Sequence, residues 1–188
     1  MKENKEYRDV IDLERGRAID AFAKLESTLC WLLSEVGNLE FNTAATVFYS
    51  NISLQPRIEI ISAILEEYYN DKFNIFWGSV RKAIDSLNGQ RNKIVHWHSY
   101  PVYDGRKEFE NTKFVLIHPR CNQDDSSEFS VCDIHQFIEK TEYLTNVIGR
   151  FRCCFRKGIS ILQQRDIELF SKTLFTFSPV NKDPFGCN

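Results

Sequence analysis

Apolar residues recur every three or four positions along four long segments of the chain, a spacing typical of one face of an α-helix. The first segment runs from about Lys5 to Val36 and stops at Gly37-Asn38, two residues that commonly end a helix. A shorter helix is expected after Asn42, whose side chain can cap residues 43–50. The first quarter of the chain is therefore predicted to form one long helix and one short helix.

The next two segments have the same helical spacing. Pro56 begins the segment 56–70, and a proline fits the first turn of a helix because its missing N–H would have no partner there. One side of this helix is expected to carry Ile58, Ile61, Ile64 or Leu65, and Tyr68. Asp71 can cap the following helix, which covers residues 72–97.

A different pattern follows residue 97. Two short runs are rich in β-forming residues, one around Val102 and one at Lys113–His118, and turn-forming residues separate them. They predict a β-hairpin between helices, followed by a polar loop at residues 122–128. Helical spacing returns from Asp133 to about Lys157 with Ile134, Phe137, Leu144, Ile148, Phe151 and Phe155.

Together these elements predict a mainly α protein, a helical bundle of four to five main helices with a β-hairpin inserted after the fourth. No repeat, low-complexity tract or linker divides the sequence, so a single domain over residues 1–188 is expected, with its core at about 5–157. The tail, residues 158–188, has no clean period and is expected to be partly helical.

The amino-acid composition is typical of a folded protein, and it bears on the expected cellular location. Hydrophobic residues make up 43% and charged residues 27% of 188, which is too apolar for a disordered chain. The charged N-terminus, MKENKEYRDVIDLERGR, is unlike the apolar region of a signal peptide, and no uncharged run reaches the roughly 18 residues of a membrane span. The six cysteines include no CxxC pair, so we expect reduced thiols and a cytoplasmic location. Because no membrane span is predicted, we also expect no contact with a membrane.

Charge and motif content narrow the possible partners and cofactors. The formal net charge of −2 argues against a broad, non-specific nucleic-acid binder, although it permits a local basic groove. Arg150, Arg152, Arg156 and Lys157 form one basic cluster, which is interpreted first as cations at a helix end and second as a guide for RNA. Neither a metal-binding motif nor a cofactor-binding motif is present, so no metal or cofactor is expected.

Titratable and hydrogen-bonding residues are concentrated in the stretch SLNGQRNKIVHWHSY, residues 86–100. At about 100° per residue, Arg91 falls on the apolar stripe of this helix, whereas Asn92 and His96 share a face that points away from it. The stripe consists of Phe73, Phe76, Val80, Ile84, Leu87 and Ile94.

These residues have a structural interpretation. An inward arginine needs a carboxylate, and Glu26, at the edge of the first apolar stripe, is a suitable partner for Arg91. In this interpretation His96 is a surface histidine that interacts favourably with the helix C-terminus. Trp77 is expected to pack in the core, while Trp97 is a candidate for stacking on bases. The vicinal thiols Cys153-Cys154 are expected to be inert.

The motif RNKIVH, residues 91–96, resembles the signature of the HEPN superfamily: an arginine, a polar residue that is commonly asparagine, a short spacer and a histidine. Its place at the end of the penultimate long helix of a helical bundle resembles that superfamily too. The likeness covers about residues 12–157 in architecture but only six residues in motif. Many HEPN proteins are metal-independent endoribonucleases that act as dimers.

Carried onto this sequence, the resemblance makes Arg91 and His96 the catalytic positions and Asn92 the polar position. RNA supplies its own nucleophile, the 2′-OH, so cleavage needs proton transfer, which a histidine performs, and charge stabilisation, which a guanidinium performs. Asn92, four residues before His96, can orient the imidazole. Arg91 and His96 project more than a quarter turn apart, so we expect a homodimer in which the second subunit completes the site.

The resemblance implies an RNA-cleaving toxin or anti-phage effector, with an antitoxin protein as a further partner. One position departs from the pattern: HEPN toxins controlled by a nucleotidyltransferase antitoxin often have a tyrosine two residues after the motif histidine. Here His98 stands at that position and the nearest tyrosine is Tyr100, which puts this regulation in doubt. His98 is interpreted first as a surface residue and second as another acid or base.

Two other functions remain open from the sequence. The chain can instead be a non-catalytic module for dimerisation or partner binding, with Arg91 as a structural ion-pair residue and His96 incidental. A third possibility is nucleotide or RNA binding without cleavage.

Overall fold

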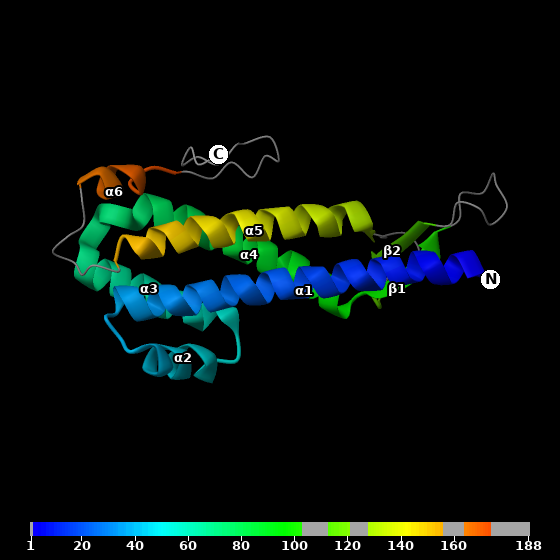
Figure 1. Ribbon diagram of the computed structural model, residues 1–188, viewed down its shortest axis with the longest axis horizontal. Coiled ribbons are helices and arrows are strands. Elements are labelled where there is room, and N and C mark those ends of the chain that lie inside the picture. The colour runs from blue at the N-terminus through cyan, green and yellow to red at the C-terminus, as the bar shows by residue number, and fades with distance from the viewer. Residues whose placement is uncertain (1, 103–112, 121–127, 156–163, 174–188) are drawn as a thin grey trace. The chain divides into compact units, whose positions relative to one another are not determined.

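The computed structural model describes residues 2–102, 113–120, 128–155 and 164–173 and shows a mainly α protein, as the sequence predicted (Figure 1). A small antiparallel sheet follows the long fourth helix. The helices are α1 (Lys2–Val36), α2 (Phe41–Ser50), α3 (Leu54–Tyr69), the short 3₁₀ helix η1 (Asn70–Phe73), α4 (Asn74–His96), α5 (Val131–Cys153) and α6 (Gln164–Leu169). The strands are β1 (His98–Val102), β2 (Lys113–Ile117) and β3 (Phe129–Ser130).

The end of α1 lies where Gly37-Asn38 predicted it. Asn38 has a φ of 49°, the left-handed conformation that asparagine tolerates better than most residues. The N–H groups of Gly37 and Leu39 donate to the carbonyls of Leu33 and Ser34 at 3.0 and 2.9 Å, so the last turn keeps its hydrogen bonds. These contacts give the Leu33 and Ser34 carbonyls, two of the last four in the helix, a partner beyond the regular helical bonds.

The fourth helix begins later than predicted: Asp71, its expected N-cap, lies inside η1, and α4 starts at Asn74. Two details of the second and third helices are wrong as well. The N-cap of α2 is Glu40, whose carboxylate accepts a hydrogen bond from the Thr43 N–H at 3.2 Å, and Asn42 lies inside the helix. In α3, Pro56 lies in the first turn as predicted, but the buried face ends on Tyr69 while Tyr68 is 59% exposed. Both errors amount to a shift of one or two positions along a helix.

The predicted hairpin is confirmed. Strands β1 and β2 pair antiparallel, from His98 opposite Ile117 to Val102 opposite Lys113. In the described part of the chain a third strand, β3, extends this sheet in the order β1-β2-β3, with Leu116 opposite Phe129. Periodicity gave no sign of β3, because two residues are too few to show a pattern. The connecting residues 103–112 and most of the predicted loop at 122–128 lie outside the described residues.

The chain divides into two compact units. The helices α1, α4 and α5 each have one part in unit 1 and the other part in unit 2. Unit 1 contains residues 1–23 and 86–141, and unit 2 contains residues 24–85 and 142–188. Neither unit is a continuous piece of the sequence. The expectation of one domain over residues 1–188 therefore stays a prediction.

Unit 2 has a core of aromatic side chains. The rings of Phe73, Phe76 and Phe151 are buried, and Phe151 lies 5.1 Å from Phe73 and 4.7 Å from Phe76, measured between ring centroids. Phe170, which follows α6, contacts Phe151 at 5.0 Å and brings part of the tail into this core. Tilted and edge-to-face contacts of this kind add to the stabilisation from burial. The expectation that the tail is partly helical is confirmed by α6.

Unit 1 has a smaller core that holds the end of α4. The apolar stripe predicted for this helix is buried, and within unit 1 it contributes Leu87 and Ile94. Phe22 of α1 stacks on Phe137 of α5, with ring centroids 6.1 Å apart. Within the ranges that the structure describes, no helix combines the length and apolar character needed to cross a membrane.

Candidate functional site

The motif residues occupy the last two turns of α4 in unit 1. Ile94 is buried and faces the core, whereas Asn92 and His96 are exposed, as their helical spacing predicted. The N–H of Trp97 donates to the Lys93 carbonyl at 2.9 Å and closes the final turn. His96 is thus the exposed last residue of a helix whose opposite face packs in the core of unit 1.

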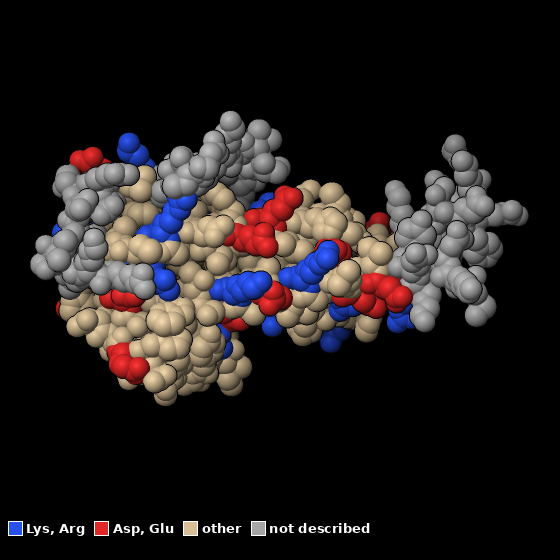
Figure 2. All heavy atoms as spheres, viewed as in Figure 1, with Lys and Arg blue, Asp and Glu red and all other residues tan. Residues whose placement is uncertain are grey.

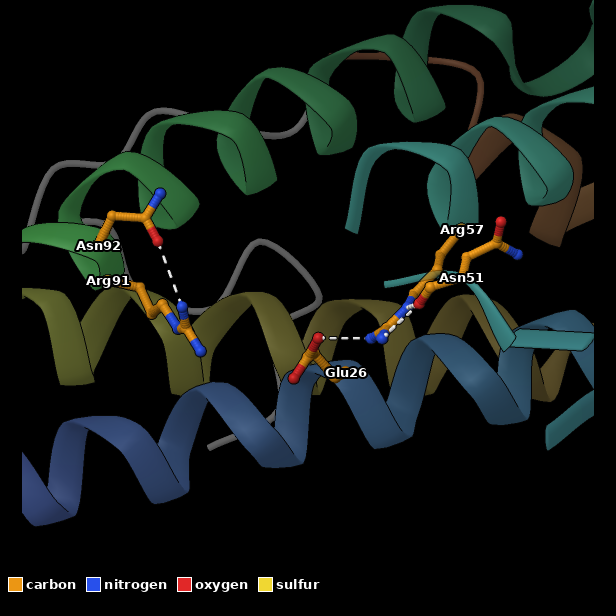
Figure 3. A network of polar contacts seen from close by, with 5 residues as sticks. All are labelled: Glu26, Asn51, Arg57, Arg91 and Asn92. Atoms are coloured by element: carbon orange, nitrogen blue, oxygen red, sulfur yellow. Dashed lines mark hydrogen bonds and ion pairs between the residues drawn. The ribbon is translucent and has the colours of Figure 1, made fainter. Parts of the chain in front are cut away.

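Arg91 is half-buried, and its side chain contacts the neighbouring Asn92. Its Nη1 donates to the Asn92 Oδ1 at 3.2 Å (Figure 3). Among the described residues Arg91 forms no ion pair with a carboxylate. The contact also uses the amide oxygen of Asn92, which had been expected to orient His96. The amide nitrogen of Asn92 is left to donate elsewhere.

Glu26, the expected partner of Arg91, is engaged by another arginine. In unit 2 its carboxylate accepts from the Arg57 Nη1 at 2.7 Å, and the Arg57 guanidinium also donates twice to the Asn51 carbonyl, at 3.0 and 2.8 Å (Figure 3). The Arg57 guanidinium lies 5.1 Å from the ring centroid of Phe48. The structural interpretation of Arg91 therefore lacks the carboxylate on which it depended.

His98 and Tyr100 lie on β1, directly after the motif helix. Both are exposed, and their spacing of two puts them on one face of the sheet. The structure thus brings His98 and Tyr100 to the α4–β1 end of unit 1, close in sequence to His96. Trp97, between His96 and His98, is only 8% exposed and is covered by the Lys93 ammonium 5.0 Å from its ring. A base would find little of this indole to stack on.

Sequence reasoning missed Arg15, which connects α1 to the end of the motif helix. Its Nε donates to the Ile94 carbonyl at 3.0 Å and its Nη2 to the Val95 carbonyl at 3.3 Å. Asp12, one turn earlier on α1, lies 3.8 Å from the Arg15 Nη1. The contact joins residues 79 and 80 positions apart, so no local pattern reveals it.

His118 is a second residue near this end that the sequence did not single out. Its ring stands edge-on to Trp97 with centroids 5.7 Å apart, and its Nδ1 accepts from the Arg120 backbone N–H at 3.0 Å. A ring nitrogen that accepts a hydrogen bond carries no proton, so the neutral ring keeps its proton on Nε2. The exposed His118 thus offers a hydrogen-bond donor beside the α4–β1 end.

Unit 1 also contains an ionic cluster between α1 and α5. Glu14 is 6% exposed, and its carboxylate accepts from the Arg17 Nη1 at 2.6 Å and lies 3.0 Å from the His135 Nε2. Each oxygen of the buried carboxylate therefore has one partner. This cluster fixes the packing of the two helices and is separate in sequence from the motif.

The predicted basic cluster is partly accounted for by packing. In unit 2 the Arg152 guanidinium lies 5.5 Å from the ring centroid of Trp31, while Arg156 and Lys157 lie outside the described residues. On the face that Figure 2 displays, basic and acidic side chains are interspersed rather than grouped by sign. Trp77 is 5% exposed and donates to the Ser62 hydroxyl at 2.8 Å, which confirms its predicted packing role.

Among the side chains that the structure describes, no group of three or more His, Cys, Asp or Glu residues is arranged to hold a metal ion. The end of α4 presents a guanidinium, an amide and exposed imidazoles. Such a set can bind an anion and transfer a proton.

Comparisons of this chain with protein-family models, with curated protein sequences and with solved structures gave no match.

Proposed function

We propose that the protein is a metal-independent endoribonuclease of the HEPN type, with Arg91, Asn92 and His96 as its catalytic residues. The observation that supports this proposal is the burial of Arg91 and the small number of partners of its guanidinium. It is half-buried beside an exposed motif, it has no ion pair among the described residues, and Asn92 holds its guanidinium. A guanidinium held in this way keeps most of its five N–H donors for a phosphate.

The reaction that these groups support is attack of the 2′-OH of RNA on the adjacent phosphorus. His96 takes the proton of the 2′-OH, this proton is passed to the departing 5′-oxygen directly or through water, and Arg91 stabilises the charge that develops on the phosphate oxygens. The P–O bond to the 5′-oxygen breaks as the bond to the 2′-oxygen forms. The products are a 2′,3′-cyclic phosphate and a 5′-hydroxyl end.

A homodimer completes the proposed site. Arg91 and His96 are five residues apart on a helix, so they project about 140° apart, and one helix presents them poorly to one phosphate. A second copy related by a twofold axis can bring its own motif helix to the same substrate. In this proposal the enzyme is a cytoplasmic toxin or anti-phage effector, and an antitoxin protein is its further partner.

The alternative function is a non-catalytic module for dimerisation or partner binding. It assigns Arg91 to an ion pair with Glu26, but Arg57 already neutralises that carboxylate at 2.7 Å. The alternative has less support for this reason, and loss of RNA cleavage in the test below would favour it.

The test is cleavage of RNA by the purified protein in excess EDTA. The unmodified protein should cut a mixed single-stranded and structured RNA, and His96→Ala should lower the rate about 10²–10⁴-fold because the proton-transfer group is lost. The matched control is His135→Gln, which removes another exposed imidazole but keeps an N–H donor for Glu14. It should cleave at the unmodified rate.

Two outcomes would overturn the proposal. One is an unmodified protein that cleaves no RNA, and the other is a His96→Ala protein as active as the unmodified one. An RNA with a single 2′-deoxy nucleotide at the cleaved position tests the chemistry separately. It should resist cleavage at that position, because the internal nucleophile is missing.

A further inference from the structure

We propose that Arg15 is a positioning residue of the same site: it holds the final turn of α4 and thereby fixes the backbone that carries His96. This inference rests on the proposed ribonuclease function. It assigns a role to a residue on a different helix, outside the RNKIVH motif, and its support is the geometry around the end of α4.

The final turn of a helix needs an outside partner. The last four carbonyls of an α-helix have no N–H within the helix to bond, and near the end of α4 these include Ile94 and Val95. Trp97 N–H supplies a bond to the Lys93 carbonyl, one step earlier. Arg15 supplies the bonds to the next two carbonyls, so it completes the hydrogen bonding up to the residue before His96.

The guanidinium is well suited to this contact. Its planar fork presents Nε and Nη2 side by side, and these two atoms reach the consecutive carbonyls at 3.0 and 3.3 Å. The side chain is 24% exposed, so water competes only in part for these bonds. A lysine offers one ammonium on a flexible stem and can replace the charge but not the paired geometry.

Asp12 holds the guanidinium from the other side. One of its carboxylate oxygens lies 3.8 Å from the Arg15 Nη1, and the other lies 4.0 Å from the Arg8 Nε. The side chain of Arg8 is 70% exposed, and among the described residues its partner is Asp12 and not a residue of α4. Arg8 and Arg15 are therefore two arginines on one helix that share a carboxylate, and Arg15 is the one that contacts the motif helix.

The catalytic consequence follows from where His96 stands. Without Arg15, two carbonyls at the helix end lose their partners and the final turn frays, so the imidazole samples more positions. Proton transfer requires the imidazole within hydrogen-bond reach of the reacting oxygen, and a displacement of about 1 Å can cost about 100-fold in rate. Substrate binding by Arg91 depends less on this turn.

The experiment compares Arg15→Ala, Arg15→Lys and the control Arg8→Ala in RNA cleavage and in amide hydrogen exchange. Arg15→Ala should lower kcat about 10- to 100-fold and leave KM within about twofold, because the imidazole is misplaced while phosphate binding persists. Arg15→Lys should recover part of kcat, and Arg8→Ala should match the unmodified protein. The exchange rate of the Trp97 amide should rise in Arg15→Ala while that of the buried Leu87 amide stays unchanged.

The two measurements separate the possible failures. An inactive unmodified protein overturns the proposed function, and with it the catalytic role of Arg15. An active unmodified protein whose Arg15→Ala variant has the same kcat overturns the positioning role alone. A fall in kcat that Arg8→Ala reproduces, or that comes with faster exchange throughout the chain including Leu87, overturns it too, because the effect then belongs to charge or to general stability.

Discussion

Arg57 in unit 2 and Arg91 in unit 1 are both half-buried arginines, in very different surroundings. The Arg57 guanidinium makes an ion pair at 2.7 Å, two hydrogen bonds to one carbonyl and contacts with two aromatic rings. Within the part of the chain that the structure describes, Arg91 makes one side-chain hydrogen bond, at 3.2 Å, to the residue beside it. Among the described residues, most N–H donors of Arg57 therefore have a partner, whereas most of those of Arg91 do not.

The difference separates a charged side chain that stabilises the packing from one that is available to bind a ligand. Burying a guanidinium costs free energy that only close partners offset, so the full set around Arg57 is what a packing role requires. Among the described residues, Arg91 has a partner for only one of its donors, and free donors are what binding an external anion requires. The comparison gives each arginine its own test, and the expected effect on folding stability decreases from Arg57 to Arg91.

The largest effect is expected for Arg57→Ala. The substitution leaves the Glu26 carboxylate, whose side chain is 27% exposed, without its countercharge, and it removes the two bonds to Asn51. Loss of one member of a fully buried pair typically costs about 3–5 kcal/mol and of an exposed pair about 1 kcal/mol or less, so about 2–4 kcal/mol is expected for this part-buried pair. Urea denaturation should show a fall of about this size in the free energy of unfolding.

The control for this prediction is Arg81→Ala on α4. Arg81 is half-buried, and a residue without a buried ion pair should change the unfolding free energy by less than about 1 kcal/mol. The double variant Arg57→Ala/Glu26→Ala should be more stable than Arg57→Ala, since no unpaired carboxylate remains. Equal losses for Arg57→Ala and Arg81→Ala would break the comparison.

Most of the secondary structure was accessible from sequence because its causes are local. The apolar stripe that begins at Phe73 of η1 and continues along α4 is buried at every predicted position, and the hairpin and the end of α1 lie where turn-forming residues predicted them. Local sequence rules were less accurate in choosing which of two nearby residues takes a given position. Glu40 rather than Asn42 caps α2, and Tyr69 rather than Tyr68 is buried. Adjacent residues with similar chemistry compete for such positions, and packing decides between them.

The partners of charged side chains were not accessible, because they join residues far apart in the sequence. Glu26 has one arginine 31 positions away and the motif arginine 65 positions away, and nothing local ranks the two. Arg15 binds carbonyls, which every residue has, so no sequence pattern marks its target. The motif itself was found because its residues lie within six positions on one helix.

A second prediction concerns alkaline pH and three groups of unit 2 whose pKa is raised, Cys30, Tyr49 and Tyr69. Burial raises the pKa of the Cys30 thiol, with an opposing effect from Arg57, and burial also raises the pKa of Tyr49 and of Tyr69. Such groups lose their protons more readily in the unfolded chain. Their stabilisation is complete below the ordinary thiol pKa, about 9, and is lost as pH rises through the higher native pKa.

The measurement is the free energy of unfolding at several pH values between about 8 and 10.5. It should decrease with rising pH, and Cys30→Ala should make the decrease shallower. Cys132→Ala removes an exposed thiol in unit 1 and serves as the control, with a slope like that of the unmodified protein. Because Cys30→Ala also leaves a small cavity, the slope with pH is the informative quantity. A slope unaffected by Cys30→Ala would exclude this thiol as a source of the decrease.

The smallest effect on stability is expected for Arg91→Ala. One hydrogen bond to a neighbouring amide is lost, which contributes about 1 kcal/mol or less. The same substitution should lower RNA cleavage about 10²–10³-fold, because the charge on the phosphate loses its stabilising donors. Urea denaturation and cleavage assays on one preparation measure both values. A loss of 3 kcal/mol or more in stability would make Arg91 a packing residue like Arg57.

The Arg91→Ala protein also tests whether the site is shared between two subunits. In a 1:1 mixture with His96→Ala, half of randomly assembled dimers contain one chain of each kind. If Arg91 of one subunit acts with His96 of the other, each mixed dimer has one intact site of two, and the mixture should recover roughly a quarter of the unmodified activity. If both residues act within one chain, every mixed dimer lacks an intact site and the mixture stays inactive. The unsaturated surroundings of Arg91 fit either arrangement, so recovery on mixing is the result that assigns the second subunit a part in the chemistry.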